Sequence, residues 1–153
     1  MEGNESIQKM VQKAFQDPIT ELLLKKSNLT NAQFETLMID LLIDNISDEK
    51  ISFKDKAYFR ERKVSRGSFS RTLSQGRARV ISSVFTILLL SYVGVLEGRP
   101  FEEYPILAEK LREYLSAVES STPGQSKAML RRIEEDLASG IASLSKPTSI
   151  KNL

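Results

Sequence analysis

The chain lacks two residue types on which most protein chemistry depends. Its 153 residues include no cysteine and no histidine. Without cysteine there is no disulfide framework, no thiolate nucleophile and no cysteine zinc site, which fits a reducing compartment and leads us to expect a cytoplasmic protein. Without histidine, the commonest metal ligand and the commonest general base are both missing. We therefore predict a protein that is not an enzyme and that has no cofactor and no metal site.

The chain also lacks a long apolar run. Residues 80–96, VISSVFTILLLSYVGVL, are the nearest candidate, and they include Ser82, Ser83, Thr86 and Ser91. The segment falls short of the roughly 20 apolar residues that a membrane span needs, and its length is typical of a core helix. Residues 1–16 do not have the charged-then-apolar order of a secretory signal. We expect a buried core helix at 80–96, no membrane partner and no export.

The rest of the composition is that of an ordinary globular protein. It is 41% hydrophobic and 27% charged, which suits one folded domain with a core. Apolar residues recur at helical spacing in 5–26, where Pro18 divides two short helices, and in 31–46, 104–118 and 126–144. A short helix is expected at 53–60 and the longest at 65–95. The sequence predicts an all-α protein, a compact bundle of six or seven helices with a long central helix.

Glycine and proline mark the boundaries of these segments. Gly94, Gly98 and Pro100 interrupt the chain after the longest helix, 122–124 forms a loop, and Pro147 closes the last helix. We found no internal repeat and no strand alternation. The prediction is a single helical domain over residues 1–144, followed by a polar tail at 145–153.

Positive charge is concentrated between residues 54 and 79. This segment has nine cations against Asp55 and Glu61, a local charge of +7, whereas the whole chain has +2 and the remainder therefore −5. A local basic patch is typical of a polyanion site, because neutralised phosphates release their counterions. The nine cations are Lys54, Lys56, Arg60, Arg62, Lys63, Arg66, Arg71, Arg77 and Arg79.

A helix through the second half of this segment would have two distinct faces. At about 100° per residue, an apolar arc contains Phe69, Leu73, Gly76, Val80 and Val84. The opposite side carries Ser68, Arg71, Gln75 and Arg79. These are side-chain types that bond phosphates and base edges. The pattern predicts a helix that is anchored by one face and contacts nucleic acid with the other.

The run from Gly67 to Val80, GSFSRTLSQGRARV, resembles the recognition helix of the helix-turn-helix in sigma-factor region 4 and related transcription regulators. The resemblance is carried by the spacing of Ser65, Gly67, Ser68, Phe69, Leu73, Gly76, Arg77 and Val80. It implies DNA-facing positions at Ser68, Arg71, Thr72 and Gln75, with Arg77 and Arg79 nearer the phosphates. The preceding Arg62-Lys63-Val64 departs from the family's apolar-Gly-apolar pattern, so a basic helix on another scaffold stays open.

Two hypotheses about function follow. The first is a non-enzymatic protein that binds double-stranded DNA through a basic recognition helix, as a transcriptional regulator or chromosome-associated factor. Lys54 to Arg66 would hold phosphates, and Tyr58 and Phe59 would be candidates for stacking on bases. The alternative is a small helical subunit of a ribonucleoprotein or protein assembly, whose basic patch holds RNA or an acidic partner. Under the first hypothesis, the C-terminal helices or residues 80–96 are candidates for a homodimer interface.

Overall fold

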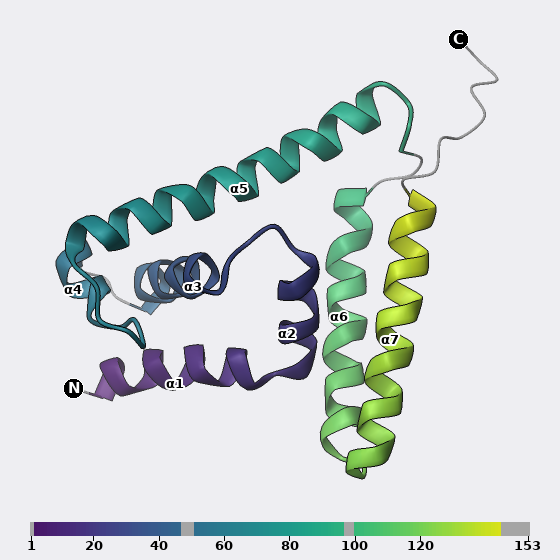
Figure 1. The fold of residues 1–153 in the computed structure, drawn as a ribbon, viewed down its shortest axis with the longest axis horizontal. Helices are drawn as coiled ribbons and strands as arrows, with labels where there is room; N and C mark the ends of the chain where they lie inside the picture. Colours follow the sequence, from purple (N-terminus) through teal and green to yellow (C-terminus); the bar gives the residue numbers. More distant parts are fainter. Residues whose placement is uncertain (1, 47–50, 97–99, 145–153) are drawn as a thin grey trace. The chain divides into compact units, whose positions relative to one another are not determined.

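The structure, a computed structural model, describes residues 2–46, 51–96 and 100–144. Over these residues it consists of seven α-helices without a strand (Figure 1), which confirms the all-α prediction. The tail predicted at 145–153 lies outside the described residues, as do Gly98 and Pro147. The helices are α1 (Glu2–Gln16), α2 (Pro18–Lys26), α3 (Asn31–Ile46), α4 (Phe53–Ala57), α5 (Arg66–Tyr92), α6 (Pro100–Glu119) and α7 (Pro123–Leu144).

The helix boundaries follow from local capping chemistry. Asp17 caps α2 by accepting a hydrogen bond from the backbone N–H of Ile19, and Pro18 occupies the first turn, where its missing N–H costs nothing. Thr30 and Gln33 form a reciprocal capping box at the start of α3, each side chain accepting from the other's backbone N–H at 3.2 and 3.1 Å. The predicted division of residues 5–26 into two helices is confirmed.

Two predicted boundaries were wrong for the same reason. α6 begins at Pro100 and α7 at Pro123, whereas the apolar spacing predicts helices that begin at residues 104 and 126. Proline is well suited to the first turn of a helix, because no intrahelical partner exists there for an N–H. After the C-terminal end of α5, Gly94 has a φ of 77°, a left-handed conformation that suits glycine and ends the helix.

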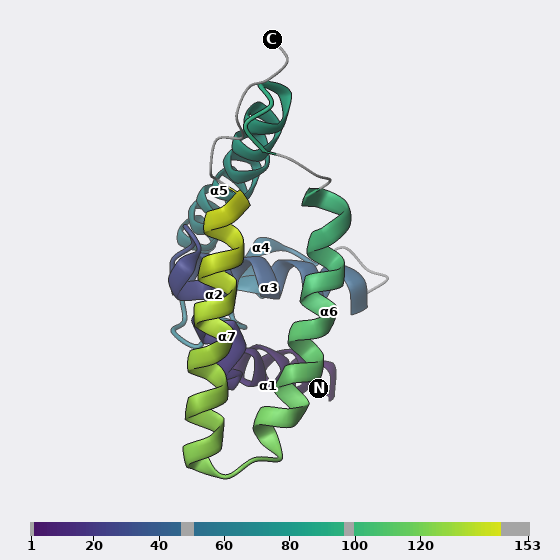
Figure 2. The same cartoon turned by 90° about the vertical axis from the view of Figure 1, so that its right-hand side faces the viewer.

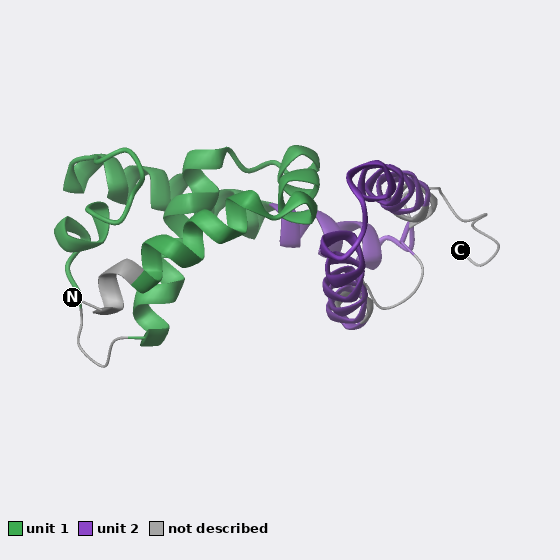
Figure 3. Cartoon of the chain, turned by 90° about the horizontal axis from the view of Figure 1, so that it is seen from below, with its two compact units in different colours: residues 1–82 green, residues 83–153 purple. Residues whose placement is uncertain are grey.

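The chain divides into two compact units, residues 1–82 and 83–153 (Figure 3). The first contains α1 to α4 and the beginning of α5, and the second contains the remainder of α5 with α6 and α7. The prediction of one domain over residues 1–144 is not tested by this division and stays a prediction.

The core of the first unit is built around α3. This helix lies between α1 and the first half of α5 (Figure 1). Its Ile39 and Ile43 are fully buried, and they pack in one cluster with residues from all the neighbouring helices. The other members of this cluster are Ile7, Val11, Ala57, Phe59, Phe69 and Leu73. The helix that others surround is therefore α3, and the prediction that the longest helix is central was wrong.

The second half of α5 is not buried, which corrects the prediction for residues 80–96. Phe85 is 64% exposed and Tyr92 is 88% exposed, and Val80, Val84 and Leu89 are also exposed. The buried residues of α5 are Phe69, Leu73 and Gly76, all in its first half, where it crosses the shorter α3. The apolar composition of 80–96 was mistaken for burial, although composition alone does not supply packing partners.

The described part of the second unit also includes a helical hairpin. α6 and α7 lie side by side in both views (Figures 1 and 2). Leu111 and Val118 of α6 and Ile133 of α7 are buried. Across the described ranges, no helix combines the length and the apolar character that crossing a membrane requires.

Candidate nucleic-acid interface

The loop after α4 and the N-terminal end of α5 position the candidate interface. Ser65 caps α5, since its carbonyl accepts from the N–H of Phe69 at 2.9 Å and its hydroxyl accepts from the N–H of Ser68 at 3.2 Å. The free N–H groups of the first turn give this end of the helix a partial positive charge. Arg62 and Lys63 precede this end in sequence, and Arg66 is the first residue of the helix. The positive charge of the side chains therefore adds to the positive end of the helix dipole.

In the first half of α5, the anchoring face forms as the helical spacing of its apolar residues predicts. Phe69 and Leu73 are buried, and Gly76 lies against α3. A Cβ on Gly76 would lie 3.1 Å from Cδ1 of Leu37, so the absence of a side chain there lets the two helices approach closely. Beyond Gly76 the prediction was wrong, because Val80 and Val84 are exposed.

The opposite face of α5 is open to solvent. Ser68, Arg71, Gln75 and Arg79 are all exposed, and Thr72 is half-buried at the edge of the face. α5 contains no acidic residue in its 27 positions. This face therefore has the exposure and the sign of charge that a phosphate-lined groove requires.

Three of the predicted cations are instead engaged with acidic residues of α3. Lys56 is 4% exposed and its Nζ lies 2.7 Å from Asp40 and 2.6 Å from Asp44. Arg77, half exposed, donates to the other carboxylate oxygen of Asp40 at 2.5 Å. Asp40 thus links the short helix α4 to α5.

Arg60 is the third of these cations. It is 8% exposed, its Nε donates to Glu35 at 2.7 Å and its Nη1 donates to the hydroxyl of Thr36 at 2.8 Å. The second carboxylate oxygen of Glu35 accepts from the backbone N–H of Glu61 at 2.6 Å. Glu35 therefore fixes both a side chain and the backbone of the loop that leads to α5. Lys56 and Arg60 hold this loop in place, and we withdraw both as phosphate contacts.

The pKa of Lys56 reflects this pairing. Burial by itself lowers the pKa of a lysine, because it penalises the charged form. The hydrogen bonds and negative charges of Asp40 and Asp44 outweigh that effect and raise the pKa of Lys56 above its ordinary value. Lys56 is consequently charged at neutral pH, and its charge is paired with Asp40 and Asp44 within the protein.

The pairing reduces the charge that the basic segment offers to a partner. Residues 54–79 have a charge of +7 in the sequence, and the three carboxylates of Glu35, Asp40 and Asp44 reduce the charge of the assembled region to +4. Five cations are exposed and make no ion pair with any residue that the structure describes. They are Lys54, Arg62, Lys63, Arg66 and Arg71.

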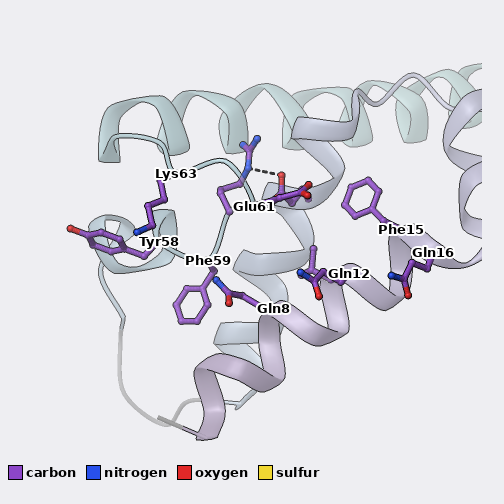
Figure 4. Close-up of a pocket in the computed structure, with 11 residues that line it drawn as sticks. Gln8, Gln12, Phe15, Gln16, Tyr58, Phe59, Glu61 and Lys63 are labelled. Atoms are coloured by element: carbon purple, nitrogen blue, oxygen red, sulfur yellow. Dashed lines mark hydrogen bonds and ion pairs between the residues drawn. The ribbon is translucent and has the colours of Figure 1, made fainter.

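Tyr58 and Lys63 line a groove of about 510 Å³ beside α1. Gln8, Gln12 and Gln16 of α1 line it as well, and Figure 4 shows Tyr58 and Lys63 at the end away from Gln16. Tyr58 is exposed, so it stays a stacking candidate. Phe59 is buried in the core cluster and is not available for stacking.

The connection before α5 does not have the geometry of a helix-turn-helix. α4 has only five residues, and the eight residues 58–65 separate it from α5. A helix-turn-helix joins its helices by a turn of about 3–4 residues. α4 and α5 therefore do not form the motif that the family resemblance implies, and α5 is held by α3 instead.

The acidic partners on α3 were missed, although the sequence contains a signal for them. Thr36, Asp40 and Asp44 recur every four residues and so lie on one side of α3, and Glu35 precedes them by one position. A row of acidic residues at helical spacing, close in sequence to a strongly basic segment, indicates ion pairs.

Comparisons of the chain with protein-family models, with curated proteins and with solved structures give no match. The interpretation of this surface accordingly depends on its charge and geometry.

Proposed function

We propose that this protein binds double-stranded DNA through the exposed face of the first half of α5 and the loop that precedes it. The observation that carries the proposal is the separation of charges around α5. Acidic residues of α3 neutralise the inward cations, while Arg62, Lys63, Arg66 and Arg71 are exposed without an ion pair to any described residue.

The dimensions of the face suit a groove of the duplex. Ser68 to Arg79 spans eleven helical steps, roughly 16 Å at 1.5 Å per residue, and a helix with its side chains fits the ~12 Å width of the major groove. Arg71 and Gln75 lie one turn apart on this face, where an arginine suits guanine and a glutamine suits adenine. Arg62, Lys63 and Arg66 lie before the helix and at its start, where contacts to phosphates set orientation.

The test is binding of the full chain to duplex DNA, single strands and duplex RNA, measured by fluorescence anisotropy over a range of salt concentrations. We expect duplex DNA to bind most tightly. Arg71→Ala and Gln75→Ala should each weaken binding to a preferred duplex by about 1–3 kcal/mol and relax the preference at one position. Lys63→Ala should weaken all duplexes alike and reduce the salt slope by about one unit.

The control is Arg131→Ala, which removes an exposed arginine from α7. It should change neither affinity nor salt slope. If Arg71→Ala and Gln75→Ala have no effect while Lys63→Ala does, the surface contacts the backbone without reading sequence. If RNA binds more tightly than DNA, or if none of these variants alters binding to any nucleic acid, the alternative of an assembly subunit is supported instead.

A further inference from the structure

We propose that the exposed apolar face in the second half of α5 packs against the same face of a second copy of this chain, in an antiparallel two-fold pair. The dimer itself does not depend on the proposed function, whereas its consequence for DNA spacing does.

The face is a continuous helical surface. Its centre is formed by Ile81, Phe85, Leu88 and Tyr92, which follow one another at intervals of four, three and four residues. That spacing places them on the seam along which two helices pack knobs into holes. Val84 and Leu89 flank the seam, and all six side chains are exposed.

The size of the face approaches that of a protein interface. Six large side chains that are each about half exposed or more present an area somewhat below the ~800 Å² per partner found in standard interfaces. A contiguous apolar surface of this size is rarely left in water by a soluble protein.

A second copy suits this face better than a partner of another chemistry. No charged residue occurs between Val80 and Leu96. A charged partner would therefore lose water without gaining an ion pair, whereas an identical apolar face loses nothing on contact. A two-fold pair is also the commonest arrangement of identical subunits.

The charge on the first half of α5 selects the antiparallel orientation. In a parallel pair, the exposed Arg66 and Arg71 of the two chains would lie at the same end and repel one another. In an antiparallel pair that crosses between residues 86 and 87, they lie at opposite ends.

The antiparallel pair also orients the two basic faces. Around α5 the buried stripe, the apolar seam and the basic face lie roughly a third of a turn apart at 100° per residue. The basic face therefore points sideways from the seam, and a two-fold axis perpendicular to the plane of the two helices leaves both basic faces on one side. Residue 75 is about 17 Å along the helix from the crossing point, so the two faces are about 34 Å apart, close to the ~34–36 Å of one turn of B-DNA.

The first test is the oligomeric state of the full chain without nucleic acid, by sedimentation equilibrium up to about 100 μM. We expect twice the 17.3 kDa of one chain. The double variant Phe85→Glu with Leu88→Glu should be monomeric and should retain its helical circular dichroism, because both residues are exposed in the single chain. Ile106→Glu is the matched control, since Ile106 on α6 is 60% exposed, and it should remain dimeric. A monomeric wild type, or a dimer that survives the double variant, overturns the proposal.

The second test establishes orientation by cross-linking. The chain has no cysteine, so Phe85→Cys and Leu88→Cys variants each carry one thiol. A crossing between residues 86 and 87 brings position 85 of one chain to position 88 of the other. A mixture of the two variants, oxidised with copper phenanthroline, should cross-link mainly between unlike chains. Preferential cross-linking of like chains overturns the antiparallel pair.

The third test separates this inference from the proposed function. Wild-type affinity should rise at least tenfold between duplexes of about 10 and about 24 base pairs, because the longer one engages both basic faces. The double variant should bind the two lengths within about twofold per site. If the dimer forms but no duplex binds, the proposed function fails and the dimer stands. If a monomer binds DNA, the dimer fails alone.

Discussion

In the two halves of α5, burial is the reverse of what their composition suggests. The first half, residues 66–79, is polar and basic, yet it contains the three buried positions of the helix. The second half, residues 80–92, is almost entirely apolar, yet its large side chains are exposed. Burial is decided by whether a neighbouring surface is present. In the first half of α5 this surface is α3, whose Leu37 and Gln33 lie against Gly76. Apolar composition shows that burying a segment would be favourable, whereas packing decides whether the segment is buried.

The largest expected effect compares one phenylalanine from each half. Phe69 is fully buried, so Phe69→Ala should reduce the free energy of unfolding by about 3–5 kcal/mol. Phe85→Ala should change it by no more than about 0.5 kcal/mol when the chain is monomeric. Urea unfolding of both variants in the Leu88→Glu background, once sedimentation has shown this background to be monomeric, gives the comparison. Equal losses would mean that the second half is packed within the single chain.

A second comparison uses two arginines from the same loop. Arg60→Ala leaves the buried carboxylate of Glu35 without its charge partner, which should cost about 3–5 kcal/mol of folding stability. Arg62 is exposed, so Arg62→Ala should leave stability within about 0.5 kcal/mol while reducing the salt slope of duplex binding by about one unit. Thermal unfolding and anisotropy titrations measure the two properties. The division of the cations into structural and nucleic-acid-binding groups fails if Arg62→Ala destabilises the fold as much as Arg60→Ala.

The smallest effect concerns the start of the helix. Ser65→Ala removes the hydroxyl that accepts from the N–H of Ser68 and should cost about 1 kcal/mol. Ser74, an exposed serine within α5, provides the control, since Ser74→Ala should be neutral or slightly stabilising through helix propensity. Chemical denaturation resolves a difference of this size. Equal effects from the two serines would argue against Ser65 as the cap.

The local features of the fold were predictable because they depend on residues near one another in sequence. Helical periodicity and proline identify α1, α2 and α3. The spacing of about 100° per residue identifies Phe69, Leu73 and Gly76 as the anchoring stripe. The exposed row of Ser68, Arg71, Gln75 and Arg79 follows from the same geometry. Prolines at 100 and 123 were misinterpreted as breaks because the same residue both ends a helix and suits its first turn.

The sequence by itself determined the all-α class, the approximate helix positions and which face of the first half of α5 is polar. Only the tertiary structure decided which charges are available, because pairing between Glu35 and Arg60, or between Asp40 and Lys56, joins residues 16 or more positions apart. Tertiary structure also decided that the apolar second half of α5 is exposed. Charge and hydrophobicity are properties of single residues, whereas neutralisation and burial are properties of pairs of surfaces, and those surfaces exist only once the chain has folded.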